Sequence, residues 1–364
     1  MKFTEEQLSV ISAPEDKVIV SASAGTGKTS TLVEAAARAI NEEGSKVVIL
    51  TLTNAAANEF KDRLKVLPHF AGTIHSFALS ELNKIKEQNL FYPLIMSESQ
   101  MRKLLLRSYI HFHEVDRDYK ETIVDIYNFM VDRGFQVEYS NQSKYNRVIR
   151  KYNELKREDG LYDFLDGPRY LLEVIGKIKY KLDYTHLFVD EVQDIDYYEF
   201  ELIKLFDSKT LLIGDPRQTI FQFRNSFDRV FDKFRKLGYN LYILTKNFRS
   251  YQEILDYSKS YLTAVRGFGG TVTGSSLLYA NKDSVILCRY NSQVQALERY
   301  FENVHTVHSY KGLEADDVIV MSFSTQNEEN RNMMLVGLTR SRKRLGIVSF
   351  DECIEIGRKI KYGY

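Results

Sequence analysis

Short and almost continuous apolar runs alternate with amphipathic stretches along most of the chain. Residues 17–40 start with such a run, pass through a glycine-containing turn and continue as an alanine-rich amphipathic segment, and residues 46–64 repeat this order. Strands with continuous apolar runs are buried on both faces, as in parallel sheets covered by helices. The pattern therefore predicts an α/β fold with parallel sheets. Further apolar runs that end in acidic, glycine- or proline-containing segments lie at residues 185–195, 210–223, 241–250, 284–290 and 317–323.

Residues 79–181 interrupt this alternation, because they are charged, rich in tyrosine and helical in pattern without a strong strand. They predict a mainly helical insertion between two strands of a first α/β domain, which would comprise residues 1–78 and 182–245. Residues 246–364 would form a second α/β domain, a division that suits a length of 364 residues. The glycine-containing segment 264–276 is expected to be a loop.

The composition excludes several classes of protein. The 44% hydrophobic and 27% charged residues describe a globular chain, and the net charge of +1 means that any cationic groove is local. Cys288 and Cys353 provide neither a disulfide framework nor the spacing of zinc ligands. The acidic start MKFTEEQLSV is unlike a signal peptide, and no stretch approaches the roughly 20 apolar residues of a membrane span. We therefore expect a cytoplasmic protein without a membrane segment.

The segment ASAGTGKTS (22–30) carries the strongest chemical signal. Glycines between a strand and a helix let backbone N–H groups turn toward an anion, and the helix directs its N-terminus at the same point. Lys28 would reach the β- and γ-phosphates of a triphosphate, and the Thr29 hydroxyl would bind Mg²⁺. Ala22 stands where the strict pattern has glycine, and the alternative is a plain glycine turn. The residues expected to line the phosphate loop are Ala24, Gly25, Thr26, Gly27, Lys28, Thr29 and Ser30.

Two acids directly follow the apolar run LFV. Asp190 would hold Mg²⁺ through a water, and Glu191 would polarise the water that attacks the phosphate. Such a pair alone commonly marks only a solvated turn, but a phosphate loop in the same chain favours hydrolysis. Arg249 and Arg340 would meet the charge that spreads on the γ-phosphoryl group, whereas a single arginine usually forms a surface ion pair.

Segments with these residues follow one another in an order that resembles the UvrD/Rep branch of superfamily 1 helicases, from about residue 3 to about residue 345. The resemblance implies two RecA-like P-loop domains with a helical insertion in the first, closing on ATP and Mg²⁺ with Arg249 and Arg340 as arginine fingers. The matching segments are FTEEQ (3–7), ASAGTGKTS (22–30), TLTNAAANEFKDRL (51–64), AGTIHSF (71–77), YDFLD (162–166), DEVQD (190–194), GDPRQTIFQFRNS (214–226), NFRS (247–250), ILCRYNSQVQALERYF (286–301), TVHSYKGLE (306–314) and VGLTRSR (336–342).

The resemblance implies further roles at the nucleotide. Gln7 would read the adenine, on which Phe248 would stack, and Glu314 would bond the ribose. Gln218 would sense the γ-phosphate and link it to the bound strand.

The resemblance also implies a path for single-stranded nucleic acid. Phe221 and Phe223 would be aromatic steps on which bases stack, with Arg224 beside them. Stacking of this kind contributes about 1–3 kcal/mol per base whatever the base, which suits a motor. From the residues alone, the two phenylalanines fit core packing on one strand face, and a lone histidine fits a satisfied polar group. The side chains expected to grip the strand's backbone are Thr53, Asn54, Thr73, His75, Thr306 and His308.

The segments GDPRQTIFQFR and KGLE resemble the branch that moves 3′ to 5′. We therefore expect an ATP-dependent helicase or translocase on single-stranded DNA and at single/double-strand junctions. Large family members carry a second inserted domain, for which the chain has no room between Asn303 and Val304. In addition, Leu52 stands where the family often has a stacking phenylalanine. Three alternatives stay open: a translocase with little unwinding, an ATPase subunit that works with protein partners in a repair, replication, nuclease or defence complex, and an RNA motor.

Overall fold

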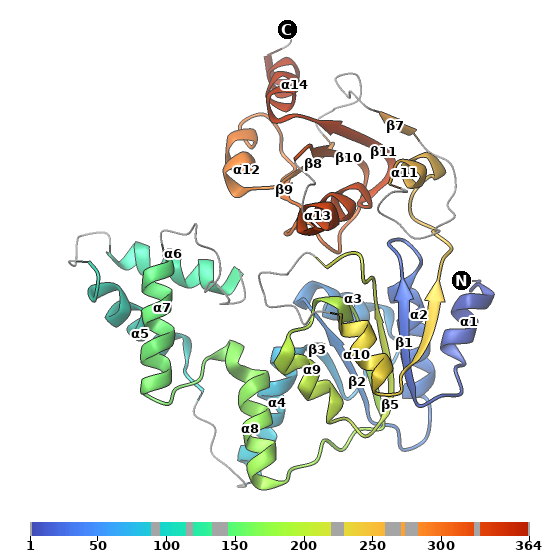
Figure 1. Ribbon diagram of the computed structural model, residues 1–364, viewed down its shortest axis with the longest axis vertical. Coiled ribbons are helices and arrows are strands. Elements are labelled where there is room, and N and C mark those ends of the chain that lie inside the picture. The colour runs from blue at the N-terminus through green and yellow to red at the C-terminus, as the bar shows by residue number, and fades with distance from the viewer. Residues whose placement is uncertain are drawn as a thin grey trace.

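The computed structural model describes residues 2–88, 95–113, 119–132, 145–219, 229–258, 271–273, 283–323 and 328–362. Two parallel sheets lie toward opposite ends of the long axis of the molecule (Figure 1). The first has the strand order β3-β2-β4-β5-β1-β6, and all its neighbouring strands are parallel. Its strands are β1 (Lys17–Ala22), β2 (Val47–Thr51), β3 (Phe70–Thr73), β4 (His186–Val189), β5 (Lys209–Gly214) and β6 (Asn240–Leu244).

The second sheet is also parallel and has the order β7-β11-β10-β8-β9. The prediction of a loop at residues 264–276 is wrong for residues 271–273, because these pair with β11 as an edge strand. Residues 264–270 and 274–276 lie outside the described residues. The α/β class with two parallel sheets is confirmed. The strands are β7 (Thr271–Thr273), β8 (Val285–Cys288), β9 (Val304–Thr306), β10 (Ala315–Met321) and β11 (Ser341–Val348).

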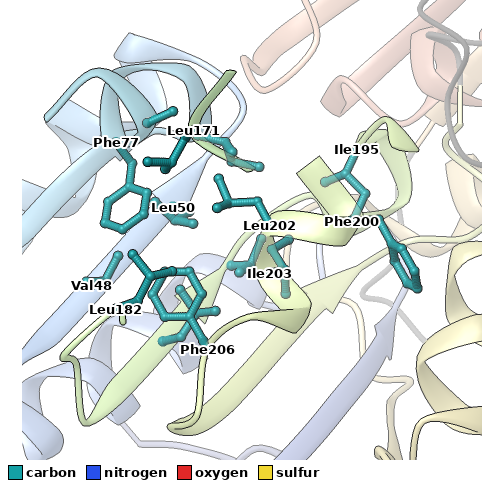
Figure 2. Close-up of a cluster of buried hydrophobic side chains, with 14 of the residues drawn as sticks. Val48, Leu50, Phe77, Leu171, Leu182, Ile195, Phe200, Leu202, Ile203 and Phe206 are labelled. Carbon is teal, nitrogen blue, oxygen red and sulfur yellow. The ribbon is translucent and has the colours of Figure 1, made fainter. Parts of the chain in front are cut away.

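Helices cover both faces of the first sheet, because alternate strand residues point to opposite sides. In β2, Val48 and Leu50 pack with α4 (Ile74–Glu87), α8 (Gly167–Ile178) and α9 (Tyr197–Lys204), as Figure 2 shows for Phe77, Leu171 and Leu202. Their neighbours Val47 and Ile49 belong to the opposite cluster, with α1 (Glu5–Ile11), α2 (Lys28–Ile40) and α3 (Asn54–Arg63). The first lobe denotes this sheet with these helices and α10 (Val230–Lys236).

The second sheet follows the same rule. In β10, Val318 and Val320 pack toward α11 (Gln252–Tyr257) and α13 (Glu328–Leu338), whereas Ile319 and Met321 pack toward α12 (Asn291–Leu297) and α14 (Phe350–Tyr362). The second lobe denotes this sheet with these four helices. Cys288 and Cys353 are both buried and unpaired within it.

A separate hydrophobic cluster belongs to α5 (Glu98–Ile110), α6 (Tyr119–Asp132) and α7 (Asn146–Glu158), which stand to one side of the first lobe (Figure 1). A largely buried polar network ties α7 to the segment that precedes α8. In it, the Lys156 Nζ lies 2.8 Å from carboxylate oxygens of both Asp163 and Asp166, and the Tyr152 hydroxyl donates to Asp163. These three helices therefore have a hydrophobic core of their own, apart from that of the first sheet. In the described part of the chain, no helix has the length and apolar content needed to cross a bilayer.

The topology brings three loops together. β1, β4 and β5 are neighbours in one parallel sheet, so the segments that follow them leave from the same edge. Ligands of open α/β sheets bind at such carboxyl ends.

Leu202 of α9 provides a test of the first lobe's core. The side chain is fully buried, whereas Leu205, at the end of the same helix, is 43% exposed. We expect Leu202→Ala to lower the free energy of unfolding by about 2–5 kcal/mol, because it removes buried methyl groups and leaves a cavity. Leu205→Ala should stay within about 0.5 kcal/mol of the wild type. Urea denaturation followed by circular dichroism measures both, and equal effects would contradict the packing described here.

Candidate nucleotide site between the two lobes

The phosphate loop joins β1 to α2 through two glycines with left-handed backbone. Gly25 has φ 72° and Gly27 φ 79°, and Thr26 closes the turn by donating its hydroxyl to the Ser23 carbonyl at 2.8 Å. Gly27 is the N-cap of α2 and has no side chain with which to cap it, so the helix directs N–H groups at the loop. The Lys28 ammonium folds back to within 3.5 Å of the Ala22 carbonyl. The loop therefore has the form that an anion requires.

The acid pair follows β4 at the same edge. Asp190 is buried, and one carboxylate oxygen accepts the Glu191 N–H at 2.9 Å. Burial and the adjacent Glu191 charge raise the pKa of Asp190. Although burial opposes ionisation, the Lys28 and Lys311 charges lower the pKa of Glu191. The expected catalytic carboxylate is thus the more strongly ionised of the two.

Glu191 has a left-handed backbone with φ 54°, a strained state for a residue with a side chain. Gln193 holds it, because its amide nitrogen donates to Glu191 at 2.5 Å and to Asp194 at 2.9 Å. The oxygen of the same amide accepts the Asp215 N–H at 3.0 Å, which ties the acid pair to the end of β5. Sequence reasoning missed Gln193; its signal is an amide between two acids in EVQD.

Gln218 connects β5 to the second lobe. Its amide nitrogen donates to Asp215 at 2.8 Å, and its oxygen accepts from the Arg340 guanidinium at 3.2 Å. Burial raises the pKa of Asp215, and the nearby Lys28 charge opposes that rise. Burial, followed by the charge of Arg249, lowers the pKa of Arg340, yet a guanidinium stays charged in proteins. Arg340 therefore reaches from the second lobe to the polar groups that follow β5.

The NFRS segment of the chain reaches the phosphate loop directly. The Asn247 amide donates to the Ala24 carbonyl at 2.6 Å, and the Phe248 N–H donates to the Gly25 carbonyl at 2.7 Å. The Phe248 side chain is 43% exposed beside this contact. Arg249 forms an ion pair with Glu314 and donates to the Thr339 carbonyl at 3.2 Å. Arg249, expected at the phosphate, and Glu314, expected at the ribose, thus form an ion pair with each other in the structure.

Two residues assigned to the nucleotide have partners of their own. Gln7 is buried; its oxygen caps α1 at the Thr4 N–H, and its nitrogen donates to the Thr26 carbonyl at 3.1 Å. It therefore touches the phosphate loop, and its contact with adenine stays a prediction. Ser30 accepts a hydrogen bond of 2.7 Å from Arg63 of α3, which ties the first turn of α2 to a neighbouring helix.

The residues expected to grip a strand lie at the starts of helices and turns. Thr53 is the N-cap of α3, which starts at Asn54, and Thr73 is the N-cap of α4. His75 lies 3.4 Å from Glu199 and stacks on Phe164.

In the second lobe, Thr306 accepts the Ser309 N–H at 3.1 Å and so shapes the turn that contains His308. Leu52 packs against the second lobe's hydrophobic cluster, so this position supports the seam between the lobes. Phe221, Phe223 and Arg224 lie outside the described residues.

Gly25 offers a test of the contact between the phosphate loop and the NFRS segment. A Cβ there would lie 2.8 Å from the Arg249 Cβ and against the Asn247 amide, in addition to the strain of φ 72°. Gly44 has nearly the same φ, 73°, and a Cβ there meets nothing within 4 Å. Gly44→Ala therefore measures the backbone cost alone.

We expect Gly25→Ala to lose about 1–3 kcal/mol more of unfolding free energy than Gly44→Ala, because the added methyl group overfills the space against Asn247 and Arg249. Thermal denaturation of the two variants measures the difference. Equal losses would mean that Asn247 and Arg249 do not lie against the loop.

Comparisons with known proteins show what this chain is similar to. The description "UvrD/REP helicase N-terminal domain" matches residues 3–237, and "Viral superfamily 1 RNA helicase core domain" matches residues 168–349. A solved structure titled "The structure of PRRSV helicase" aligns with a TM-score of 0.47 and 13% identity, covering 95% of this chain and 54% of that chain.

Among curated relatives, the "Probable DNA helicase II homolog" of Mycoplasma capricolum is 26% identical over 71% of this chain and 41% of its own length. "ATP-dependent DNA helicase Rep" of Buchnera aphidicola is 26% identical over 79% of the chain in one strain and 23% over 99% in another, covering 48% and 63% of those proteins. The chain therefore spans about half the length of its relatives. Because the first match covers more than half of its residues, this chain belongs to the UvrD/Rep family of superfamily 1 helicases.

Proposed function

We propose that the chain is an ATP-driven motor that moves 3′ to 5′ along single-stranded DNA and separates duplexes at junctions. One observation carries this proposal: Arg340, between α13 and β11 of the second lobe, donates at 3.2 Å to the amide oxygen of Gln218, which follows β5 at the sheet edge that holds the phosphate loop. A triphosphate bound in that loop would be touched by both lobes. Splitting it would then change the affinity of the lobes for each other, which is how a hinge cycle is driven.

Each side chain at the seam has a role that suits hydrolysis. Lys28 and the N–H groups of the loop would bind the β- and γ-phosphates, and Glu191 would accept the proton of the attacking water. Arg249 and Arg340 would stabilise the charge on the transferred phosphoryl group.

A magnesium ion suits the oxygen donors present. The Thr29 hydroxyl and the buried Asp190 carboxylate are hard ligands, and a divalent cation would offset the repulsion between Asp190 and Glu191. When bound with ATP, Mg²⁺ would supply charge neutralisation at the phosphates.

A strand would run across the carboxyl edges of both sheets. Thr53 and Thr73 start helices, whose N-termini attract phosphate groups, and Thr306 and His308 lie in the corresponding turn of the second lobe. Contact through backbone phosphates does not depend on sequence, as translocation requires. The names of the relatives, which are DNA helicases, favour DNA as the strand, and a DNA substrate would place the motor in the cytoplasm.

The proposed domain division keeps residues 1–78 and 182–245 as one RecA-like domain and 246–364 as the other. Within the insertion at 79–181, the independent core is that of α5 to α7, while α4 and α8 pack on the first sheet.

Two other functions have specific support. Only residues 298–303 join α12 to β9, where larger family members carry a domain, and this short link favours a translocase with little unwinding of its own. The match to a viral RNA helicase core favours an RNA strand.

Lys28→Ala and Glu191→Gln test the proposed chemistry. Each should lower the rate of strand-stimulated ATP hydrolysis by at least about 100-fold, because each removes a group that acts on the transition state. Phosphate release with and without single-stranded DNA measures this. The controls are Lys204→Ala and Glu201→Gln, which change the same residue types in a surface ion pair of α9. Normal turnover in Lys28→Ala or Glu191→Gln would refute the site.

Polarity is tested with partial duplexes that carry one single-stranded tail. We expect ATP-dependent strand separation with a 3′ DNA tail at a rate at least about tenfold above that with a 5′ tail or a blunt end. An RNA 3′ tail and a tail blocked by a bound protein are run beside them. Preference for the 5′ tail contradicts the proposed direction, preference for RNA favours the RNA motor, and displacement of protein without strand separation favours the translocase.

A further inference from the structure

Lys311 crosses from the second lobe into the first. It follows the turn that starts at Thr306, yet its ammonium forms an ion pair with Asp194, in the short turn after Glu191, and donates to the Gln218 carbonyl at 2.9 Å. The Lys311 side chain is only 7% exposed and that of Asp194 is 0% exposed. A buried pair of this kind is held together because either charge alone would be costly.

The pair closes a ring of hydrogen bonds at the seam. Asp194 accepts from Gln193, whose oxygen accepts the Asp215 N–H, and Asp215 accepts from the Gln218 amide. Lys311 bonds both ends, at Asp194 and at the Gln218 carbonyl. Four members of the ring belong to the first lobe, and Lys311 is its member from the second: the ring is Lys311, Asp194, Gln193, Asp215 and Gln218.

Glu191 is attached to this ring. The Gln193 amide nitrogen donates at once to Glu191, at 2.5 Å, and to Asp194, at 2.9 Å. If Lys311 were withdrawn, the Asp194 carboxylate would lose its ammonium partner. Asp194 and Glu191 would then compete for the Gln193 amide nitrogen.

The other end of Lys311 is tied to the expected strand path. Thr306 accepts hydrogen bonds from the N–H groups of Ser309, through its side chain, and Tyr310, through its carbonyl, both at 3.1 Å. Tyr310, directly before Lys311, is buried in the second lobe's core. A displacement at Thr306 or His308 would therefore move the backbone of Lys311 with it.

We propose that Lys311 is a positioning residue, which places Glu191 for hydrolysis when the second lobe has closed on a bound strand. This inference rests on the proposed motor function and adds to it the route by which strand binding reaches the acid. The arrangement is two-state, because the buried Asp194 is either paired with Lys311 or must find another partner.

The experiment measures the kcat and KM for ATP with and without saturating single-stranded DNA. Lys311→Met should lower the stimulated kcat at least about tenfold and bring the ratio of stimulated to unstimulated rates close to one. The KM for ATP should change less than about threefold, because the Lys311 ammonium bonds Asp194 and the Gln218 carbonyl, which follow β4 and β5 and not the phosphate loop after β1. Lys311→Arg, which keeps the charge, should recover part of the stimulation.

A folding defect is separated from lost coupling by a second variant. Lys311→Met with Asp194→Asn removes both charges, so its denaturation midpoint should return toward that of the wild type while DNA stimulation stays lost. Normal stimulation in this double variant would overturn the role of Lys311, as would a rise in KM with unchanged kcat. If ATP hydrolysis by the wild type does not respond to a strand, the proposed motor function itself is wrong. This outcome depends on the wild type alone, so it is distinguished from a failure of the role of Lys311.

Discussion

Buried negative charge at the seam is the constraint on which the rest of the structure depends. Asp190 and Asp194 are buried after β4 and Glu191 beside them is half-buried, and such a group is tolerable only when cations lie against it. Lys28 supplies one cation from the first lobe, while Lys311 and Arg340 come from the second. The acids therefore favour contact between the lobes.

The local parts of this arrangement could be predicted from the sequence. The phosphate loop and the acid pair each require only a strand, a turn and a few adjacent residues, so they can be identified without knowing what lies opposite. Gln193 and Lys311 could not be found in that way, because their roles depend on partners from other strands or from the other lobe. Hydrophobic periodicity likewise indicates that a helix has a buried face but does not identify the surface that covers it, and so it does not separate α4 and α8 from the insertion.

Leu52 illustrates how one substitution changes the role of a position. A phenylalanine would offer a flat face to a base, whereas this leucine packs on the second lobe's cluster around Val320 and Leu338. The seam between the lobes thus has an apolar contact beside its ion pairs. An apolar contact has no required direction and, unlike the ion pairs, is not weakened by the screening of charges in salt.

The separate core of α5 to α7 has a consequence for how the molecule tolerates change. The chain leaves the first sheet through α4 and returns through α8, and these two helices pack side by side on that sheet. A module whose entry and exit are neighbours can be shortened, enlarged or exchanged without disturbing the scaffold that carries it. Surface chemistry on that module is therefore free to diversify, while the first sheet and the loops at its carboxyl edge keep their geometry.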